Sequence, residues 1–460
     1  YQGPPKDFAM VVPVPVVLKN KQVRTLDDGV FERIDRYSAP RLVEYWEQDP
    51  CPSRAPSLLA QRSSVRLEAD SASGSIGGGK KKEKVVKVEA EFNVGEYEIA
   101  ILSSEKSTAL EQWLHDHDYN IPDGSAPYLQ PYIQKGMYFF VARVNIDKVE
   151  FEQGRAVLSP LRFHYQSKQF KLPVRLGLIN SKGSQDLIVF TLSPTHRYRV
   201  ANYPNVTIPT NIAVNEKVTD NFGGFYTELF NRVIAENPKA VVTEYTWQAG
   251  KCDPCATPPV SKKDLMTLGA DLLAPKKVVY HTPEEVDVFG GRPPTRKPKR
   301  RVVSVVDPND WVLTRLHTAY TKETLGKDLV FEKAEPIRGG RGMPRGVEGV
   351  LPDGQAKQGR RNNFQGRYVV LHHWEGETTC ENPRRGRWGG PPGGPRYSRQ
   401  GQSRTAGNLA FSPQKPEPLS RMVETKTVDG LEDPVSSYDE PLASFPKGEE
   451  RDDDDGAPDK

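Results

Sequence analysis

The residues best suited to chemistry in this chain of 460 are its four cysteines, which are Cys51, Cys252, Cys255 and Cys380. A Cys-x-x-Cys pair can be a redox-active dithiol, half of a zinc site or a structural disulfide. A redox-active pair usually needs a helix to begin at the first thiol, because the helix N-terminus lowers the pKa of that thiol. Here the two intervening residues are aspartate and proline, and a further proline pair, Pro258-Pro259, follows. No helix is expected there, so a structural disulfide is the favoured interpretation.

The zinc and disulfide alternatives differ in the partners that they require. A zinc site at the Cys-x-x-Cys pair would need ligands from Cys51, Cys380, His372 or His373, which lack the paired spacing of zinc-binding knuckles. Four cysteines allow three full pairings, and spacing alone does not choose between them. We favour Cys252 with Cys255 and Cys51 with Cys380. The second bridge would close a long loop and would require an oxidising compartment.

Two clusters of histidines are weak candidates for metal ligands. His115 and His117 alternate with aspartates at the end of a predicted helix, where adjacent side chains point about 100° apart and histidine also complements the helix dipole. His372 and His373 are adjacent on a predicted strand, which sends their side chains to opposite faces. Packing or surface roles are the simpler interpretation of both clusters, and no cofactor is expected.

Two further readings of the polar residues stay open. The first is an enzyme or metal-dependent site assembled in three dimensions from residues on or near predicted strands, with His164, Tyr165, His196 and His317 as candidates. The second is nucleic-acid binding through arginine-glycine segments, one at Arg338 to Gly342 and one at Arg384 to Trp388. The net charge of +4 at pH 7 is nearly balanced, which gives no strong nucleic-acid signal. Sequence signatures of nucleophile elbows, phosphate loops, zinc-protease helices and dinucleotide folds are missing, so no catalytic residue is assigned.

The elements that would position these residues are mainly strands. Alternating or β-branched runs predict strands at 8–18, 84–102, 138–146, 156–165, 170–179, 186–192, 197–201, 240–247, 311–321, 328–331 and 367–372. The five strands between 138 and 201 have the spacing of an antiparallel meander. Helical spacing of apolar residues predicts helices within 25–40, 108–117, 215–237 and 261–268. The pattern predicts an α+β fold of largely antiparallel sheets with a few amphipathic helices.

Composition divides the chain into four parts. We predict a β-rich α+β domain at 1–284 with a flexible loop at about 71–84, and a basic, proline-rich linker or insertion at 285–301. A β-rich segment at 302–380 would pack on the first domain, and 381–460 would be a disordered tail that ends in acidic residues. Prolines number 40, about 9% of residues against about 5% in typical proteins, and they concentrate at strand edges, in the linker and in the tail. No run approaches the roughly 18 apolar residues of a transmembrane helix.

Several segments together resemble an uncharacterised family of bacterial exported proteins, domain of unknown function 2330. They include FAMVVPVPVVL, APRLVEYWEQDPC, EFNVGEYEIAILS, VANYPNVTIPTN, CDPC and VLTRLHTAYT, and the resemblance extends from Tyr1 to about Trp388. Members typically begin with a signal peptide, so the resemblance implies export and supports disulfides, and it supplies no catalytic residues. We therefore expect a non-enzymatic structural or interaction protein of the periplasm, cell envelope or extracellular space, with an envelope protein or surface partner.

Overall fold

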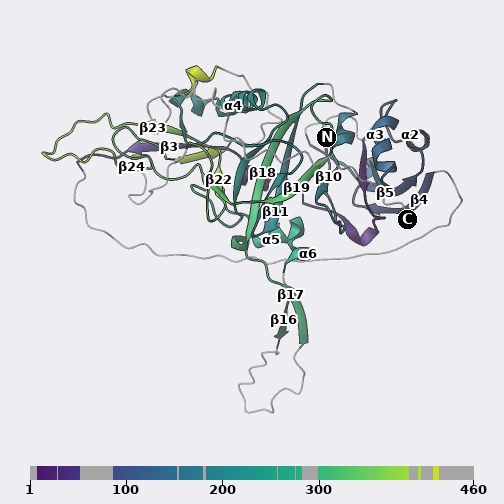
Figure 1. The fold of residues 1–460 in the computed structure, drawn as a ribbon. Coiled ribbons are helices and arrows are strands. Elements are labelled where there is room, and N and C mark those ends of the chain that lie inside the picture. The colour runs from purple at the N-terminus through teal and green to yellow at the C-terminus, as the bar shows by residue number, and fades with distance from the viewer. Residues whose placement is uncertain are drawn as a thin grey trace, which may run out of the picture.

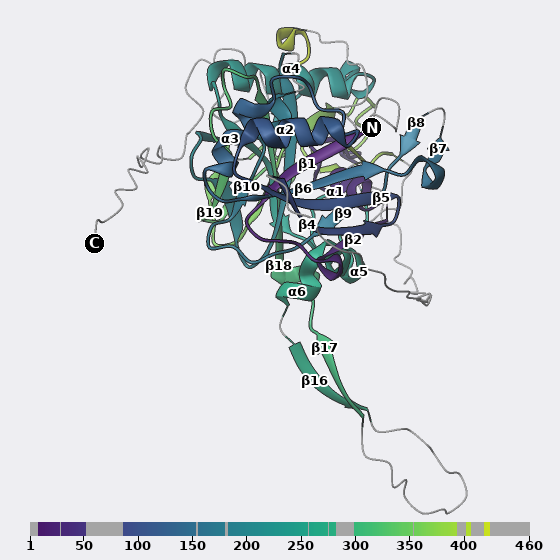
Figure 2. The same ribbon diagram turned by 90° about the vertical axis from the view of Figure 1, so that its right-hand side faces the viewer.

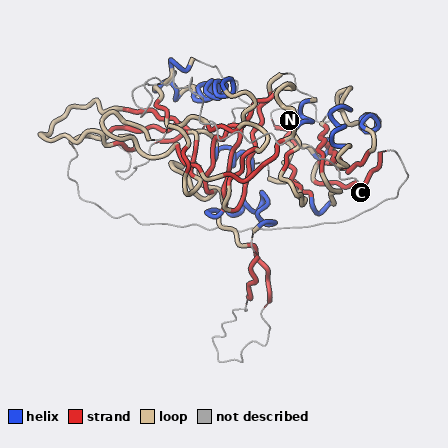
Figure 3. Tube along the Cα trace, in the orientation of Figure 1, coloured by secondary structure: helices blue, strands red, loops and turns tan. Residues whose placement is uncertain are grey.

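The computed structural model describes residues 8–27, 29–51, 86–152, 155–179, 183–255, 257–274, 276–281, 299–352, 354–392, 402–405 and 418–423. Within these ranges the protein has the predicted α+β fold, in which strands form the interior and helices lie on the outer faces of the sheets (Figure 3). The predicted flexible loop at 71–84 lies outside the described residues. Every helix in the described ranges is too short or too polar to cross a membrane.

An antiparallel sheet at one end of the molecule has the strand order β1-β6-β5-β4. Its strands are β1 (Ala9–Val14), β4 (Val86–Val94), β5 (Tyr97–Ser104) and β6 (Tyr138–Val144). Two helices, α2 (Ser107–Asp116) and α3 (Ala126–Ile133), bury Leu110, Trp113 and Leu129 against one face (Figure 1). The short pair of β2 (Val23–Thr25) and β9 (Leu161–Phe163) contributes to the core on the other face. Covering both faces explains why β5 is apolar at consecutive positions.

The central sheet carries the residues that matter most below. Its main path is β11-β18-β15-β22-β20-β21, and β13 also pairs with β15. The strands are β11 (Gln185–Pro194), β13 (Asn205–Thr207), β15 (Val241–Gln248), β18 (Trp311–Tyr320), β20 (Ile337–Gly339), β21 (Lys357–Gln358) and β22 (Asn363–Gln365). Helix α4 (Phe222–Glu236) covers one face, with Phe225, Leu229 and Val233 buried at helical spacing. Helix α1 (Gly29–Ser38) packs on the same face nearer the start of β18, where Trp311 and Leu313 lie, together with α5 (Lys262–Leu265) and the π-helical turn Met266–Ala270.

A smaller sheet lies beside the central one and is partly parallel. Its path is β14-β23-β3-β24, with β25 also paired to β3. The strands are β3 (Arg41–Glu47), β14 (Ile212–Ala213), β23 (Arg367–His372), β24 (Trp388–Gly389) and β25 (Gln402–Thr405). Strands β3 and β23 run parallel, with Arg41 opposite Arg367, which brings segments far apart in the sequence side by side.

The predicted meander between 138 and 201 is wrong, although strands do occur there. Strand β6 belongs to the first sheet, β11 pairs with β18, and β12 (Arg197–Val200) pairs with β19 (Leu329–Ala334). A further short strand, β10 (Lys171–Leu172), lies on the other edge of β19. Local alternation identifies a strand but not its neighbour, and here the partners come from the later half of the chain.

The remaining elements are peripheral. Strands β16 (Lys276–His281) and β17 (Lys299–Ser304) form a hairpin that projects from the body in both views (Figures 1 and 2), so the last residues of the predicted basic linker are strand, while 285–298 lie outside the described residues. Other short elements are β7 (Glu150–Glu152), β8 (Arg155–Val157), α6 (Asp271–Leu273) and the 3₁₀ turns at Asn20–Gln22, Ile146–Lys148, Arg175–Leu178, Glu216–Thr219, Pro308–Asp310 and Leu419–Arg421. Strands β24 and β25 and the turn at Leu419–Arg421 pack on the body, unlike the disordered tail predicted for 381–460.

Candidate functional site

The Cys-x-x-Cys segment lies just after β15 and closes a short disulfide loop. The structure joins Cys252 to Cys255, with a Cα–Cα distance of 5.1 Å, and joins Cys51 to Cys380, with a Cα–Cα distance of 5.6 Å. This is the pairing that we favoured from the sequence. The Asp253-Pro254 peptide bond within the loop is cis. Cys255 is exposed and Cys252 is half-buried, so the bridge is accessible from solvent.

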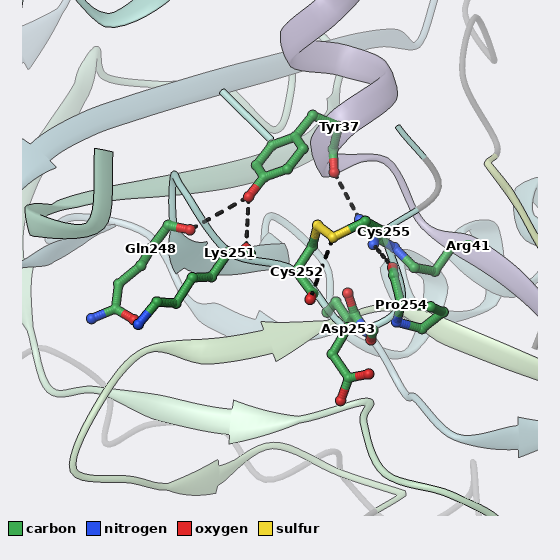
Figure 4. Close-up of a disulfide and its surroundings, with 9 residues drawn as sticks. Tyr37, Arg41, Gln248, Lys251, Cys252, Asp253, Pro254 and Cys255 are labelled. Atoms are coloured by element: carbon green, nitrogen blue, oxygen red, sulfur yellow. Dashed lines mark hydrogen bonds between the residues drawn. A yellow bond between two sulfur atoms is a disulfide. The ribbon is translucent and has the colours of Figure 1, made fainter. Parts of the chain in front are cut away.

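Three buried side chains donate hydrogen bonds to the backbone carbonyls of this loop. The Tyr37 hydroxyl donates to the Lys251 carbonyl at 2.6 Å, and Arg41 Nη1 donates to the Pro254 carbonyl at 2.7 Å (Figure 4). Gln365 Nε2 donates to the Asp253 carbonyl. Three elements, α1, β3 and β22, therefore fix the backbone of the loop, and the disulfide holds it compact.

A cavity of about 490 Å³ opens beside this loop. Its wall includes Trp247, Pro259 and the two cysteines, while Lys251, Arg341 and Arg361 supply cations. All three cationic residues are exposed, and Asp253 is the one acidic residue among those that line the cavity. A second cavity of about 170 Å³ adjoins the first, since the two share Gln248 and Arg361. The combination of an apolar wall and converging cations is typical of a site for a small anionic molecule.

Two buried arginines lie behind the disulfide loop. Arg41 is 1% exposed and Arg367 is 0% exposed, and they are register partners on β3 and β23. Besides Pro254, Arg41 donates to the Tyr37 carbonyl at 2.7 Å, while Arg367 Nε donates to Asn211 Oδ1 at 2.7 Å. Burial lowers the pKa of both guanidinium groups, and nearby tyrosines and Asp253 oppose that effect.

These two arginines have no carboxylate partner within salt-bridge distance in the described part of the chain. Arg41 Nε and Arg367 Nη2 are buried and have no hydrogen-bond acceptor among the described residues. Buried charges in proteins are normally paired, because desolvation of an isolated charge is costly. Arg41 and Arg367 therefore leave a net positive potential behind the cavity.

A separate buried ionic network crosses the central sheet. Glu244, which is 0% exposed, lies at a bulge in β15, and its carboxylate accepts from Arg315 Nε at 2.5 Å and from His317 Nδ1 at 2.6 Å. The Tyr226 hydroxyl also donates to this carboxylate. Arg315 and His317 are two residues apart on β18, so both point to the same face of the sheet. Asp35 binds the other side of Arg315, with a distance of 2.5 Å between Arg315 Nη1 and Asp35 Oδ1.

The charges in this network hold each other ionised. Burial alone would raise the pKa of Glu244, but His317 and Arg315 outweigh it and lower that pKa to about 2. Burial alone would likewise lower the pKa of His317, but the Glu244 and Asp186 carboxylates outweigh it and raise that pKa. The Phe230 ring stacks on the His317 ring at a centroid distance of 3.8 Å. The network is saturated with protein partners, which is the arrangement of a structural ion cluster.

The histidines proposed as metal ligands lie apart from this network. His117 stacks on Trp113 at 3.9 Å, and His115 lies 3.5 Å from the exposed Asp123 carboxylate. His372 stacks on Trp46 and pairs with Glu44 at 3.1 Å, and His373 meets the Trp388 ring edge-on. Among the described residues, no three histidine, cysteine or acidic side chains are grouped as metal ligands.

Of the four candidates for an assembled site, His317 pairs with carboxylates. His164 donates its backbone N–H to the Gln22 carbonyl, and the Tyr165 ring packs against Phe163. His196 Nδ1 lies 2.7 Å from the Thr195 hydroxyl. The structure thus gives these residues separate local environments.

Sequence reasoning missed most of the cavity. The arginine-glycine pattern around Arg341 indicates a nucleic-acid contact and gives no sign of a cavity. Arg41 and Arg367 carried a usable signal, since each begins a run of apolar residues that forms a buried strand. Glu244 carried the same signal within the sequence VVTEYTW.

Comparison with known proteins places the chain in one family. The sequence profile described as "Uncharacterized protein conserved in bacteria (DUF2330)" matches residues 1–332, which confirms the resemblance drawn from the sequence segments. Searches of curated proteins and of solved structures gave no match.

Proposed function

Because the chain belongs to the DUF2330 family of uncharacterised bacterial proteins, we propose that it is a non-enzymatic, exported protein of the cell envelope that binds a partner. The observation that carries this proposal is the use of all four cysteines in two disulfides. Disulfides form and persist in oxidising compartments such as the periplasm, and they are rare in the bacterial cytosol.

The Cys51–Cys380 bridge supports a stabilising role for the disulfides. It ties the segment after β3 to the segment after β23 across 329 residues of sequence. The same region is held by Glu47, which is 2% exposed and receives both Arg385 Nε at 2.8 Å and Arg385 Nη2 at 2.7 Å. Bonds from Arg385, with help from the Gly386 N–H, lower the pKa of Glu47 to about 2. A cross-link of this kind supports the proposal that the protein works outside the cytosol.

The arrangement of polar groups supports binding rather than catalysis. Glu244, Arg315 and His317 contact one another in the core, where a substrate has no access. The larger cavity offers cations and an apolar wall, but a nucleophile with an adjacent base is not among its lining residues. We propose this cavity as the binding site of the protein.

Thiol mapping and cell fractionation test the proposal. In the native host, the full-length protein is expected in the periplasmic or envelope fraction, separated from a cytosolic marker enzyme. Mass spectrometry of peptides prepared without reductant should then find Cys51 linked to Cys380 and Cys252 linked to Cys255. As a matched control, the Cys380→Ser variant should free Cys51 alone and keep the Cys252–Cys255 link. Four free thiols in correctly exported protein, or recovery of the protein in the cytosol, would contradict the proposal.

A further inference from the structure

We infer that the cavity beside the Cys252–Cys255 loop binds a small molecule that carries two or more closely spaced oxyanion groups, carboxylate or phosphoryl. This inference rests on the proposed binding function and names the ligand class. Its first support is the charge of the rim, where neither Arg341 nor Arg361 forms a salt bridge with a carboxylate of the described residues. Arginine is suited to this task because its planar guanidinium binds carboxylate and phosphate through two parallel hydrogen bonds.

The third cationic residue of the cavity, Lys251, also interacts with a carboxyl group that does not line the cavity. Its charge contributes to lowering the pKa of the exposed Asp307 carboxyl, after the larger effect of hydrogen bonds from Asn309. Lys251 therefore adds to the potential of the cavity without defining the geometry of binding. Arg341 and Arg361 are the residues that we expect to contact the anion directly.

The second support comes from the buried arginines behind the loop. Arg41 and Arg367 are not exposed to solvent and are not neutralised by an ion pair within the described residues, so solvent screens their charges little. Arg341 lies close enough to Arg367 to lower its pKa, although burial and the opposing effects of Tyr45 and Asp253 come first. Four guanidinium groups thus act on one small region that contains one acidic residue, Asp253.

The shape of the site limits the size of the ligand. A volume of about 490 Å³ falls within the range of small-molecule sites, roughly 300 to 1,000 Å³. Trp247, Pro259 and the disulfide provide an apolar surface for the carbon skeleton of a ligand. The adjoining cavity extends the site toward Arg360 through the shared Arg361. A compact molecule with closely spaced anionic groups fits a cavity of this size better than a polymer does.

Calorimetric titration of the purified, oxidised full-length protein tests the inference. The probes are citrate for carboxylates, pyrophosphate for phosphoryl groups and sorbitol as a neutral polyol. We expect binding of citrate, pyrophosphate or both, weakened by added salt, and no binding of sorbitol. The Arg341→Gln/Arg361→Gln double variant should bind at least about tenfold more weakly. The Arg345→Gln variant is the matched control, because Arg345 is exposed on the same loop as Arg341 but does not line the cavity.

Each outcome has a defined meaning. Binding of citrate alone assigns a carboxylate ligand, binding of pyrophosphate alone assigns a phosphoryl ligand, and binding of both supports the shared oxyanion chemistry. Failure of both probes to bind overturns the inference, and so does equal weakening by the control and the double variant. Circular dichroism of each variant checks that it is folded. Since this titration uses purified oxidised protein, its result is independent of where the protein resides in the cell, so the two proposals can fail separately.

Discussion

Glu244 is the residue whose replacement tests the buried ionic network most directly. The Glu244→Gln substitution keeps the size of the side chain but removes the negative charge that Arg315 and His317 share. In the variant, two cationic groups remain in the core, and the hydrogen bonds that they donate meet a neutral amide. Breaking a buried ion pair by removing one partner typically destabilises a protein by about 3 to 5 kcal/mol, although Asp35 still pairs with Arg315 in this variant.

The pKa of Glu244 gives a similar magnitude. Lowering that pKa from 4.5 to about 2 corresponds to about 3 kcal/mol of stabilisation of the ionised form, at roughly 1.4 kcal/mol per pH unit. This contribution is present above pH 4.5 and is lost as the pH falls through the folded-state value. The glutamine variant lacks it at every pH.

His317 makes the free energy of unfolding depend on pH, and the direction of this dependence is opposite in the wild type and in Glu244→Gln. In the wild type its pKa is raised above 6.5, so its contribution is fully present below pH 6.5 and is lost as the pH rises through the folded-state pKa. Without the Glu244 carboxylate, burial and the charge of Arg315 should lower the pKa of His317, although the exposed Asp186 remains 3.3 Å away. Below pH 6.5, His317 then binds a proton in the unfolded variant more readily than in the folded variant. The free energy of unfolding of the variant therefore falls as the pH falls below 6.5.

The assay is urea unfolding followed by tryptophan fluorescence at a series of pH values. The difference in unfolding free energy between the wild type and Glu244→Gln should widen as the pH falls from about 8.5 to about 5.5, and should narrow again below about 4.5. The matched control is Glu332→Gln, which removes a partly exposed pair with Arg199 and should cost at most about 1 kcal/mol. A loss below about 1 kcal/mol for Glu244→Gln, or a difference that does not change with pH, would refute the reasoning.

Three further changes have distinct expected outcomes. The Cys51→Ser/Cys380→Ser variant should lose roughly 5 kcal/mol of unfolding free energy, because the removed bridge closes a loop across 329 residues, and a large drop in melting temperature by calorimetry would show this. The Cys252→Ser/Cys255→Ser variant opens a much shorter loop and should lose about 2 kcal/mol, so a loss as large as that of the first variant would contradict the loop-length argument. Gly340→Ala should prevent correct folding of the loop that carries the cavity cations, because φ is +65° there and a Cβ atom would collide with the Gln365 carbonyl; unchanged thermal stability would count against it.

The sequence by itself determined the secondary structure of this protein and the side chains that are available for chemistry. The apolar spacing of Phe225, Leu229 and Val233 predicted the helix that covers the central sheet, since a 3.6-residue period places these side chains on one face. The alternating runs predicted most strands, and the proline between the paired cysteines argued against a helix at that point. These properties depend on residues close together in the chain, so the sequence is enough to predict them.

Only the tertiary structure decided which of these pieces meet. Arg41 and Arg367 become neighbours because β3 and β23 pair in parallel, and strand alternation does not specify a distant partner or its direction. Glu244 reaches Arg315 and His317 because β15 pairs with β18, and the sequence of β15 does not specify that distant partner. The cavity and its charge follow from these long-range pairings, so the candidate site emerged where the sequence had shown only isolated arginines and a pair of cysteines.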